Sequence, residues 1–126
     1  MHYGIVNEYL EATVSLNVLG AGGANLIIDF VIDTGCTEEM ILPPGFIDQL
    51  HRIRSSDILL TVADGTTDAY ARYKISVEWH GQPREAIAIS MGTEPLVGMR
   101  LLRGSNLSVD ADPGGRVTIT ELTRQG

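Results

Sequence analysis

The sequence has little cysteine and little positive charge. Its single cysteine, Cys36, excludes an intrachain disulfide and fits a reducing compartment. Nine lysines and arginines stand against sixteen aspartates and glutamates, which gives a formal net charge of −7 at pH 7. Nucleic acids and anionic membrane surfaces attract proteins through basic patches, so we expect neither as a partner.

Targeting and metal-binding patterns are also missing. Residues 1–8 show no basic segment followed by an apolar run, so we expect no secretory signal. No apolar run approaches the ~18 residues that a membrane helix needs. The three histidines, His2, His51 and His80, and Cys36 lack metal-ligand spacing, so we expect no metal and no other cofactor. Together these absences predict a cytoplasmic protein.

What the sequence does contain is typical of a folded, strand-rich domain. Hydrophobic residues make up 44% of it and charged residues 20%. The length of 126 residues fits one domain spanning 1–126, because two domains would each bury too little surface. Fourteen glycines, several of them in turn-like contexts, favour many short strands over long helices. The expected fold class is therefore all-β.

The pattern of apolar residues predicts where the strands lie. Apolar and polar residues alternate over 10–18, as in a strand with one buried face. The nearly continuous apolar run over 26–32 predicts a strand buried on both faces. An Asp-Gly pair at 64–65 predicts a two-residue hairpin turn. Further elements are expected as strands at 39–42, 58–62, 67–73, 75–79, 85–90, 107–109 and 117–119, a helical turn at 45–50, and a short helix from residue 99 that Gly104 ends.

Asp33 is the first candidate for chemistry. It ends the apolar run and begins the turn Asp33-Thr34-Gly35, where burial and turn hydrogen bonds can tune the chemistry of a carboxylate. Gly35 lets the backbone bend back so that its amide approaches that carboxylate. The alternative is an ordinary turn in which Asp33 caps its own loop, and the tripeptide alone favours this alternative.

Three segments together favour a catalytic role of Asp33 over an ordinary turn. Residues 30–37, Phe-Val-Ile-Asp-Thr-Gly-Cys-Thr, resemble the active-site strand of retropepsin-like aspartic proteases. Residues 62–66, Val-Ala-Asp-Gly-Thr, resemble the flap hairpin of that family, and residues 95–102 resemble its second signature, two apolar residues and a glycine before a short helix. The segments occur in the order of the family, and the resemblance covers most of the chain.

The resemblance implies a fold and an activity. The fold would be a single-lobe retropepsin-like closed β-barrel with one short helix in its carboxyl-terminal half. The activity would be that of an aspartic endopeptidase, in which two carboxylates act on one water. The sequence contains Asp-Thr-Gly only once. The pair must therefore come from two chains, which predicts a homodimer acting on a peptide or protein substrate.

The resemblance also assigns roles to individual residues. Asp33, Thr34 and Gly35 would be the catalytic residues, with the Thr34 hydroxyl bracing the loop of the partner. The flap residues that cover the substrate would be Ala63, Asp64, Gly65 and Thr66. The structural signature would be Leu96, Val97 and Gly98. Gly98 either lets the helix pack tightly beneath the active-site loop or simply separates strand from helix.

Two departures from the family leave alternatives open. Cys36 stands where the family usually has alanine or serine, and we favour a small packing residue over a redox-sensitive or nucleophilic thiol. The flap region lacks a glycine-rich tip, which keeps open a non-catalytic peptide-binding or dimerisation module on the same fold.

The alternating Val117, Ile119 and Leu122 make the carboxyl end a candidate for dimer strands.

Overall fold

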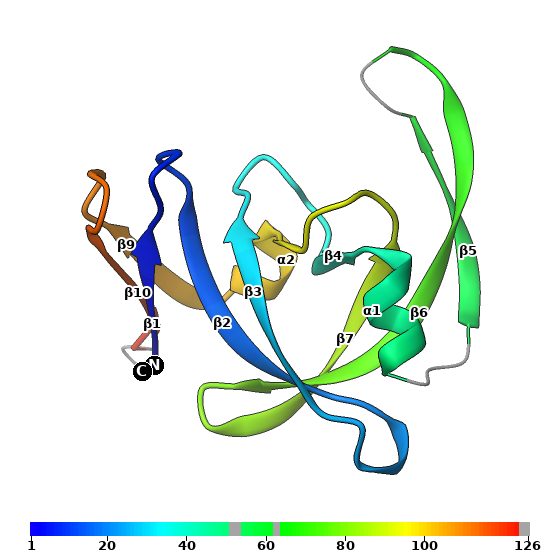
Figure 1. Ribbon diagram of the computed structural model, residues 1–126, viewed down its shortest axis with the longest axis horizontal. Coiled ribbons are helices and arrows are strands. Elements are labelled where there is room, and N and C mark those ends of the chain that lie inside the picture. The colour runs from blue at the N-terminus through cyan, green and yellow to red at the C-terminus, as the bar shows by residue number, and fades with distance from the viewer. Residues whose placement is uncertain (51–53, 62–63, 124–126) are drawn as a thin grey trace.

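The computed structural model describes residues 1–50, 54–61 and 64–123 (Figure 1). The described chain consists of strands and three short helical segments. The strands are β1 (His2–Val6), β2 (Ala12–Leu19), β3 (Leu26–Ile32), β4 (Met40–Leu42), β5 (Arg54–Thr61), β6 (Thr67–Trp79), β7 (Gln82–Ser90), β8 (Leu96–Val97), β9 (Ser105–Val109) and β10 (Arg116–Glu121). The helical segments are the 3-10 turn η1 (Ala21–Gly23) and the helices α1 (Pro44–Gln49) and α2 (Met99–Leu102).

The strands form one sheet that closes on itself. Their order is β5-β6-β7-β4-β8-β3-β2-β1-β10-β9, and β2 also pairs with β6 through Val18↔Val77 and Leu19↔Ser76. This extra pairing closes β6, β7, β4, β8, β3 and β2 into a barrel, whereas the β5 end and the β1-β10-β9 end extend beyond it. The prediction of an all-β closed barrel is confirmed.

The barrel core comes from the inward face of alternating residues. In β2, Val14, Leu16 and Val18 are at most 2% exposed, as the alternation over 10–18 predicts. Phe30 of β3 and Met40 of β4 are fully buried in the same cluster. The remaining barrel strands add buried aliphatic side chains and Trp79, among them Ile75, Val77, Ala86, Ala88 and Val97.

The prediction that β3 is buried on both faces is wrong. Ile27 is 78% exposed, and the Asp29 carboxylate accepts a hydrogen bond from the Ser15 hydroxyl of neighbouring β2. Both side chains lie on the outer surface of the barrel, where β2 presents Ser15 and Asn17 opposite them. An apolar run in this chain therefore marks a strand with one buried face and one partly apolar outer face.

The two ends of the chain meet in the extension beside the barrel (Figure 1). β1, which the sequence did not predict, pairs with β2 on one side and with β10 on the other. Both edges of β10 are thus paired within the chain, and Val117 and Ile119 are fully buried. Their side chains are unavailable to a partner, whereas Leu122 is 56% exposed.

Both helices are short, and each adds buried side chains to the core of the barrel. α1 begins at Pro44, a residue suited to the first helical position, and buries Ile47. It adds a second helix to the one that the resemblance implied, at the helical turn that the sequence predicts. α2 buries Leu101 and Leu102 and ends at Leu102, two residues before Gly104, whose φ of +85° turns the chain into β9.

Candidate active site

Asp33 lies where two parallel strands end side by side. β3 pairs with β8 through Val31↔Leu96 and Ile32↔Val97. The backbone N–H of Asp33 then donates to the carbonyl of Val97 at 2.9 Å. The Asp-Thr-Gly segment and the Leu-Val-Gly segment, which the sequence separates by about sixty residues, are therefore direct neighbours in space.

The turn after β3 wraps around the Asp33 carboxylate. The Gly35 N–H donates to Asp33 Oδ1 at 3.0 Å, as the sequence predicts, and the Cys36 N–H donates to the Asp33 carbonyl at 3.1 Å. A Cβ on Gly35 would lie 3.2 Å from Asp33 Oδ1 and would crowd it. The carboxylate itself stays half-buried and can receive both a water and a substrate group.

Gly98 fits against the back of this turn. A Cβ at Gly98 would lie 2.1 Å from the Glu38 carbonyl oxygen and 3.0 Å from Cys36 Sγ. Its φ is −103°, so glycine is required here by the close approach and not by a left-handed backbone. The Met99 N–H donates to the Cys36 carbonyl at 2.8 Å and ties the start of α2 to the turn. This geometry favours the packing interpretation of Gly98.

The Asp33 carboxylate opens onto a groove of about 690 Å³. Four parts of the chain line the groove: the turn after β3, β4, the end of β5, and the connection from β7 to β8. The end of β5 belongs to the β5–β6 hairpin, which stands away from the barrel in Figure 1. The lining residues are Asp33, Gly35, Cys36, Thr37, Glu38, Ile41, Leu60, Thr61, Met91, Gly92, Thr93, Glu94 and Leu96.

Three of the predicted flap residues, Asp64, Gly65 and Thr66, lie in the connection between β5 and β6. Thr61 pairs with Thr67, so this connection is longer than the predicted two-residue turn. The Asp64 carboxylate accepts hydrogen bonds from the hydroxyl and the N–H of Thr66, and these bonds hold the pKa of Asp64 below its ordinary value. Gly65 has a φ of +88°, which suits glycine. Ala63 lies outside the described residues.

The longer connection has a physical reason. The Asp64 side chain bonds two residues ahead and forms a local turn of its own, which takes up chain between the paired threonines. The hydroxyls of Thr61 and Thr67 are 2.8 Å apart and close its base. Asp64 therefore serves the turn, while Leu60 and Thr61 are the hairpin residues that reach the groove.

A second depression also borders Asp33. It has a volume of about 470 Å³ and shares Asp33, Glu94 and Leu96 with the groove. Its other lining residues come from the start of β2 and the end of β3, and include the exposed Leu10 and Thr34. Within the described part of the chain, the Thr34 hydroxyl makes no hydrogen bond. Thr34 is thus exposed at the surface of the chain.

Cys36 behaves as a packing residue. Burial raises the pKa of its thiol, and the nearby Asp33 and Glu38 carboxylates act in the same direction. A raised pKa keeps the group as a neutral thiol, which is a weak nucleophile. The structure thus favours the packing interpretation.

An ion pair that could not be predicted from the sequence links the segment after the Asp33 turn to β7 and α2. Arg84 Nη2 of β7 lies 3.0 Å from Glu39 Oε2, and Arg84 Nη1 donates to the Leu101 carbonyl of α2 at 2.9 Å. The other oxygen of Glu39 accepts the Ile87 N–H at 3.0 Å. Neither residue belongs to a motif, and only the folded barrel brings them together.

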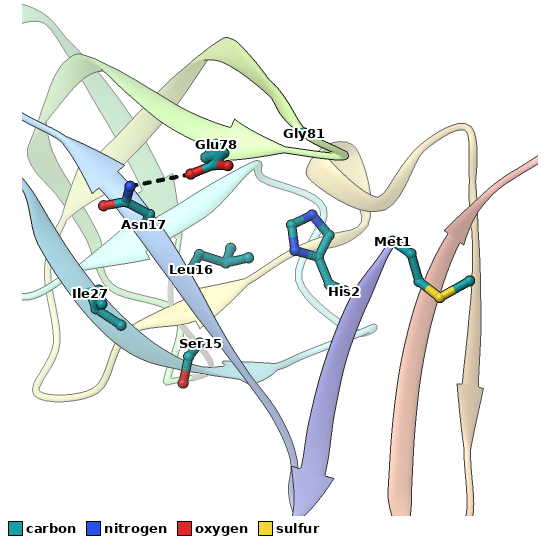
Figure 2. A pocket seen from close by; sticks show the side chains of 8 residues that line it. All are labelled: Met1, His2, Ser15, Leu16, Asn17, Ile27, Glu78 and Gly81. Carbon is teal, nitrogen blue, oxygen red and sulfur yellow. Dashed lines mark hydrogen bonds between the residues drawn. The ribbon is translucent and has the colours of Figure 1, made fainter.

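A further depression of about 370 Å³ lies away from Asp33, between β1, β2 and the β6–β7 turn (Figure 2). Figure 2 shows the His2 imidazole directed from β1 toward that turn, and Asn17 donating to Glu78 Oε2 at 3.2 Å. Among the described residues, no group of three or more His, Cys, Asp or Glu side chains could hold a metal ion. None of the described helices is long and apolar enough to cross a membrane.

The closed barrel, the Asp-Thr-Gly turn on β3 and the helix behind it together have the fold of the retropepsin-like aspartic proteases. A retropepsin-like aspartic protease from Rickettsia conorii superposes with a TM-score of 0.56 at 15% identity, over 96% of this chain and 91% of that chain. The EIAV protease, in complex with the inhibitor HBY-793, gives 0.55 at 12% identity, over 77% and 89%. Neither a protein-family model nor a curated protein matches the sequence. The predicted fold is confirmed.

Proposed function

We propose that the protein is an aspartic endopeptidase that works as a homodimer, with one Asp33 from each chain. The observation that carries this proposal is the position of Asp33. Asp33 is half-buried at the end of β3, its side chain lines a groove of about 690 Å³, and its carboxylate accepts a hydrogen bond from the Gly35 N–H. The likeness of the fold to two aspartic proteases supports the same reaction class.

The chemistry follows from two carboxylates that share one proton. One Asp33, ionised, takes a proton from a water whose oxygen attacks the peptide carbonyl carbon. The other Asp33, protonated, donates a hydrogen bond to the carbonyl oxygen. The C–N bond then breaks as a proton passes to the leaving nitrogen. Like charges at short distance do not both ionise, so the pair titrates as one unit.

The groove lining supports a shared pair, because Asp33 is its only aspartate among the described residues. Asp29 lies on the outer surface of β3 with Ser15, and Asp64 is held by Thr66 in the hairpin tip. Asp33 and Thr34 also face the second depression, where the loop of a partner fits the open hydroxyl of Thr34. The dimer supplies the second carboxylate at this position.

The β5–β6 hairpin is the element suited to cover a substrate. Its Leu60 and Thr61 line the groove, and β5 lies at one end of the sheet order with an unpaired outer edge. An extended peptide can bind beside such elements through backbone hydrogen bonds, with its side chains in the groove. Movement of the hairpin tip would admit and enclose the substrate.

The test is peptide cleavage by the full chain and by Asp33→Asn. We expect the full chain to cleave members of a fluorogenic peptide library between acidic and neutral pH, and Asp33→Asn to lose at least a thousandfold of that rate. Asp29→Asn is the matched control, because it makes the same change on the same strand outside the groove. Retained cleavage by Asp33→Asn would refute the proposal. Absence of cleavage by the full chain, with retained peptide binding, would favour a non-catalytic binding module.

The cytoplasmic location and the extent of the domain stay predictions. The prediction of the location rests on the single cysteine, which fits a reducing compartment, and on the lack of an apolar run of membrane-helix length. Fractionation of the cells that make the protein, with antibody detection, tests it directly.

A further inference from the structure

The groove around Asp33 is acidic as well as apolar. Glu38 and Glu94 line it together with Asp33, and its described lining contains no lysine, arginine or histidine. Ile41, Leu60, Met91 and Leu96 supply its apolar surface. A peptide that fills the groove therefore meets an aliphatic wall next to the reacting carboxylate and two further carboxylates beside that wall.

Glu38 is not neutralised by its neighbours. It is half-buried and has no ion-pair partner among the described residues. The nearest arginine on α2, Arg100, donates its Nε hydrogen to the Thr37 carbonyl at 3.2 Å and lines a different depression. Arg84 is occupied by Glu39.

Glu94 holds the complementary position. It lies on the connection between β7 and β8, just before Pro95 and Leu96, and it lines both depressions that Asp33 lines. It is exposed and has no ion-pair partner among the described residues. A basic side chain of a substrate in either depression can therefore reach Glu94.

We propose that the preferred substrate carries a lysine or arginine within a few residues of the scissile bond. The basic residue pairs with Glu38 or Glu94. Opposite charges in a partly enclosed groove attract more strongly than in open water. The net charge of −7 adds attraction at longer range. This inference rests on the proposed function, whose site it specifies.

The experiment compares peptides that differ in one charge. Fluorogenic peptides with leucine or phenylalanine at the scissile bond carry lysine, glutamine or glutamate at each flanking position in turn. We expect kcat/KM for the best lysine peptide to exceed that of its glutamate counterpart by roughly tenfold or more at low salt. The ratio falls as salt rises to about 0.5 M, because salt screens the attraction.

Variants assign the preference to its residues. The double variant Glu38→Gln/Glu94→Gln is expected to reduce the lysine-to-glutamate ratio at least threefold while it still cleaves the glutamine peptide. Glu85→Gln is the matched control, since Glu85 is exposed on β7 and does not line the groove. Equal cleavage of lysine and glutamate peptides, or a ratio unchanged by the double variant, would overturn the inference.

A binding measurement separates this inference from the proposed function. The same labelled peptides are titrated with Asp33→Asn by fluorescence anisotropy, which needs no cleavage. Preferential binding of lysine peptides that is lost in the added double variant supports the acidic groove even if the parent chain cleaves nothing. Cleavage without charge preference sinks the inference and leaves the protease intact. Absence of both cleavage and binding contradicts both.

Discussion

Arg84 and Glu39 meet across 45 residues of sequence and join the active-site turn to the strand and helix behind it. One guanidinium bonds both the Glu39 carboxylate and the Leu101 carbonyl. The side chains are 33% and 15% exposed, so this pair is partly shielded from water. It connects β7, α2 and the segment that follows Asp33-Thr34-Gly35. It therefore holds Glu39 in place, next to the groove residue Glu38.

Removal of this arginine tests the connection. Arg84→Met keeps most of the side-chain volume but leaves the half-buried Glu39 carboxylate and the Leu101 carbonyl without their donor. We expect the free energy of unfolding to fall by about 1–3 kcal/mol, measured by urea denaturation. Arg103→Met, an exposed residue just after α2, is the control and should change it by less than about 0.5 kcal/mol. Equal effects of the two variants would contradict a structural role of the pair.

Gly98 cannot accept a side chain without movement of its neighbours. Gly98→Ala places a methyl group 2.1 Å from the backbone oxygen of Glu38, so the turn or α2 has to move. We expect a loss of about 3 kcal/mol of stability, the upper part of the range for overpacking, and a fall in cleavage activity. Gly45→Ala is the control: its Cβ meets nothing within 4 Å inside α1, and the change should add up to about 1 kcal/mol. A stable, active Gly98→Ala would refute the close approach.

His2 makes the stability dependent on pH. The His80 N–H donates to His2 Nε2 at 3.0 Å, which requires this nitrogen to be unprotonated, and His2 stacks on Trp79 at 4.6 Å. Burial lowers the pKa of His2, His80 and the amino terminus lower it further, and Glu78 opposes them. Burial lowers the pKa of His80 as well.

The sign of the effect follows from these directions. In the unfolded chain the histidines bind protons near pH 6.5, whereas in the folded chain they bind them only at lower pH. The free energy of unfolding is therefore unaffected well above pH 6.5 and falls as the pH drops through that value. We expect His2→Gln, which keeps an acceptor but does not titrate, to show a shallower fall between pH 7.5 and 5. Identical pH profiles for variant and parent would exclude His2 as a contributor.

A catalytic pair drawn from two chains, as proposed, would make activity depend on protein concentration. If each chain supplies one Asp33, the activity per chain falls on dilution below the dissociation constant of the dimer, because dimer formation follows mass action. Initial rates over a thousandfold range of concentration, compared with sedimentation measurements, provide the test. Constant activity per chain in a fully monomeric sample would rule out a pair drawn from two chains.

Individual strands and the place of Asp33 could be predicted because their signals are local, whereas the closed barrel was implied by the resemblance of three segments to retropepsin-like aspartic proteases. Alternation located β2, an apolar run located β3, and glycine with a preceding apolar pair located β8 and α2. β1 escaped, because its inward residues include His2 and Gly4, and its apolar Tyr3 and Ile5 face outward. Its position depends on pairing with β10, at the other end of the chain.

The site was predicted only in part for a similar reason. Asp33 and Gly35 lie as the sequence indicates, but the wall of the groove comes from Leu60, Met91 and Glu94, which belong to no motif. Their proximity to Asp33 results from strand register and from the course of two connections. The charge and size of the side chains that line the groove can therefore be assigned only once the fold is known.

The contact between Gly98 and the active-site turn also limits where the protein can vary. A Cβ at residue 98 would overlap the Glu38 carbonyl oxygen, so a larger residue there would displace the turn or α2. The end of β5 and the connection from β7 to β8 also line the groove but take no part in this contact. The molecule separates a part that must stay constant from a part that is free to diversify.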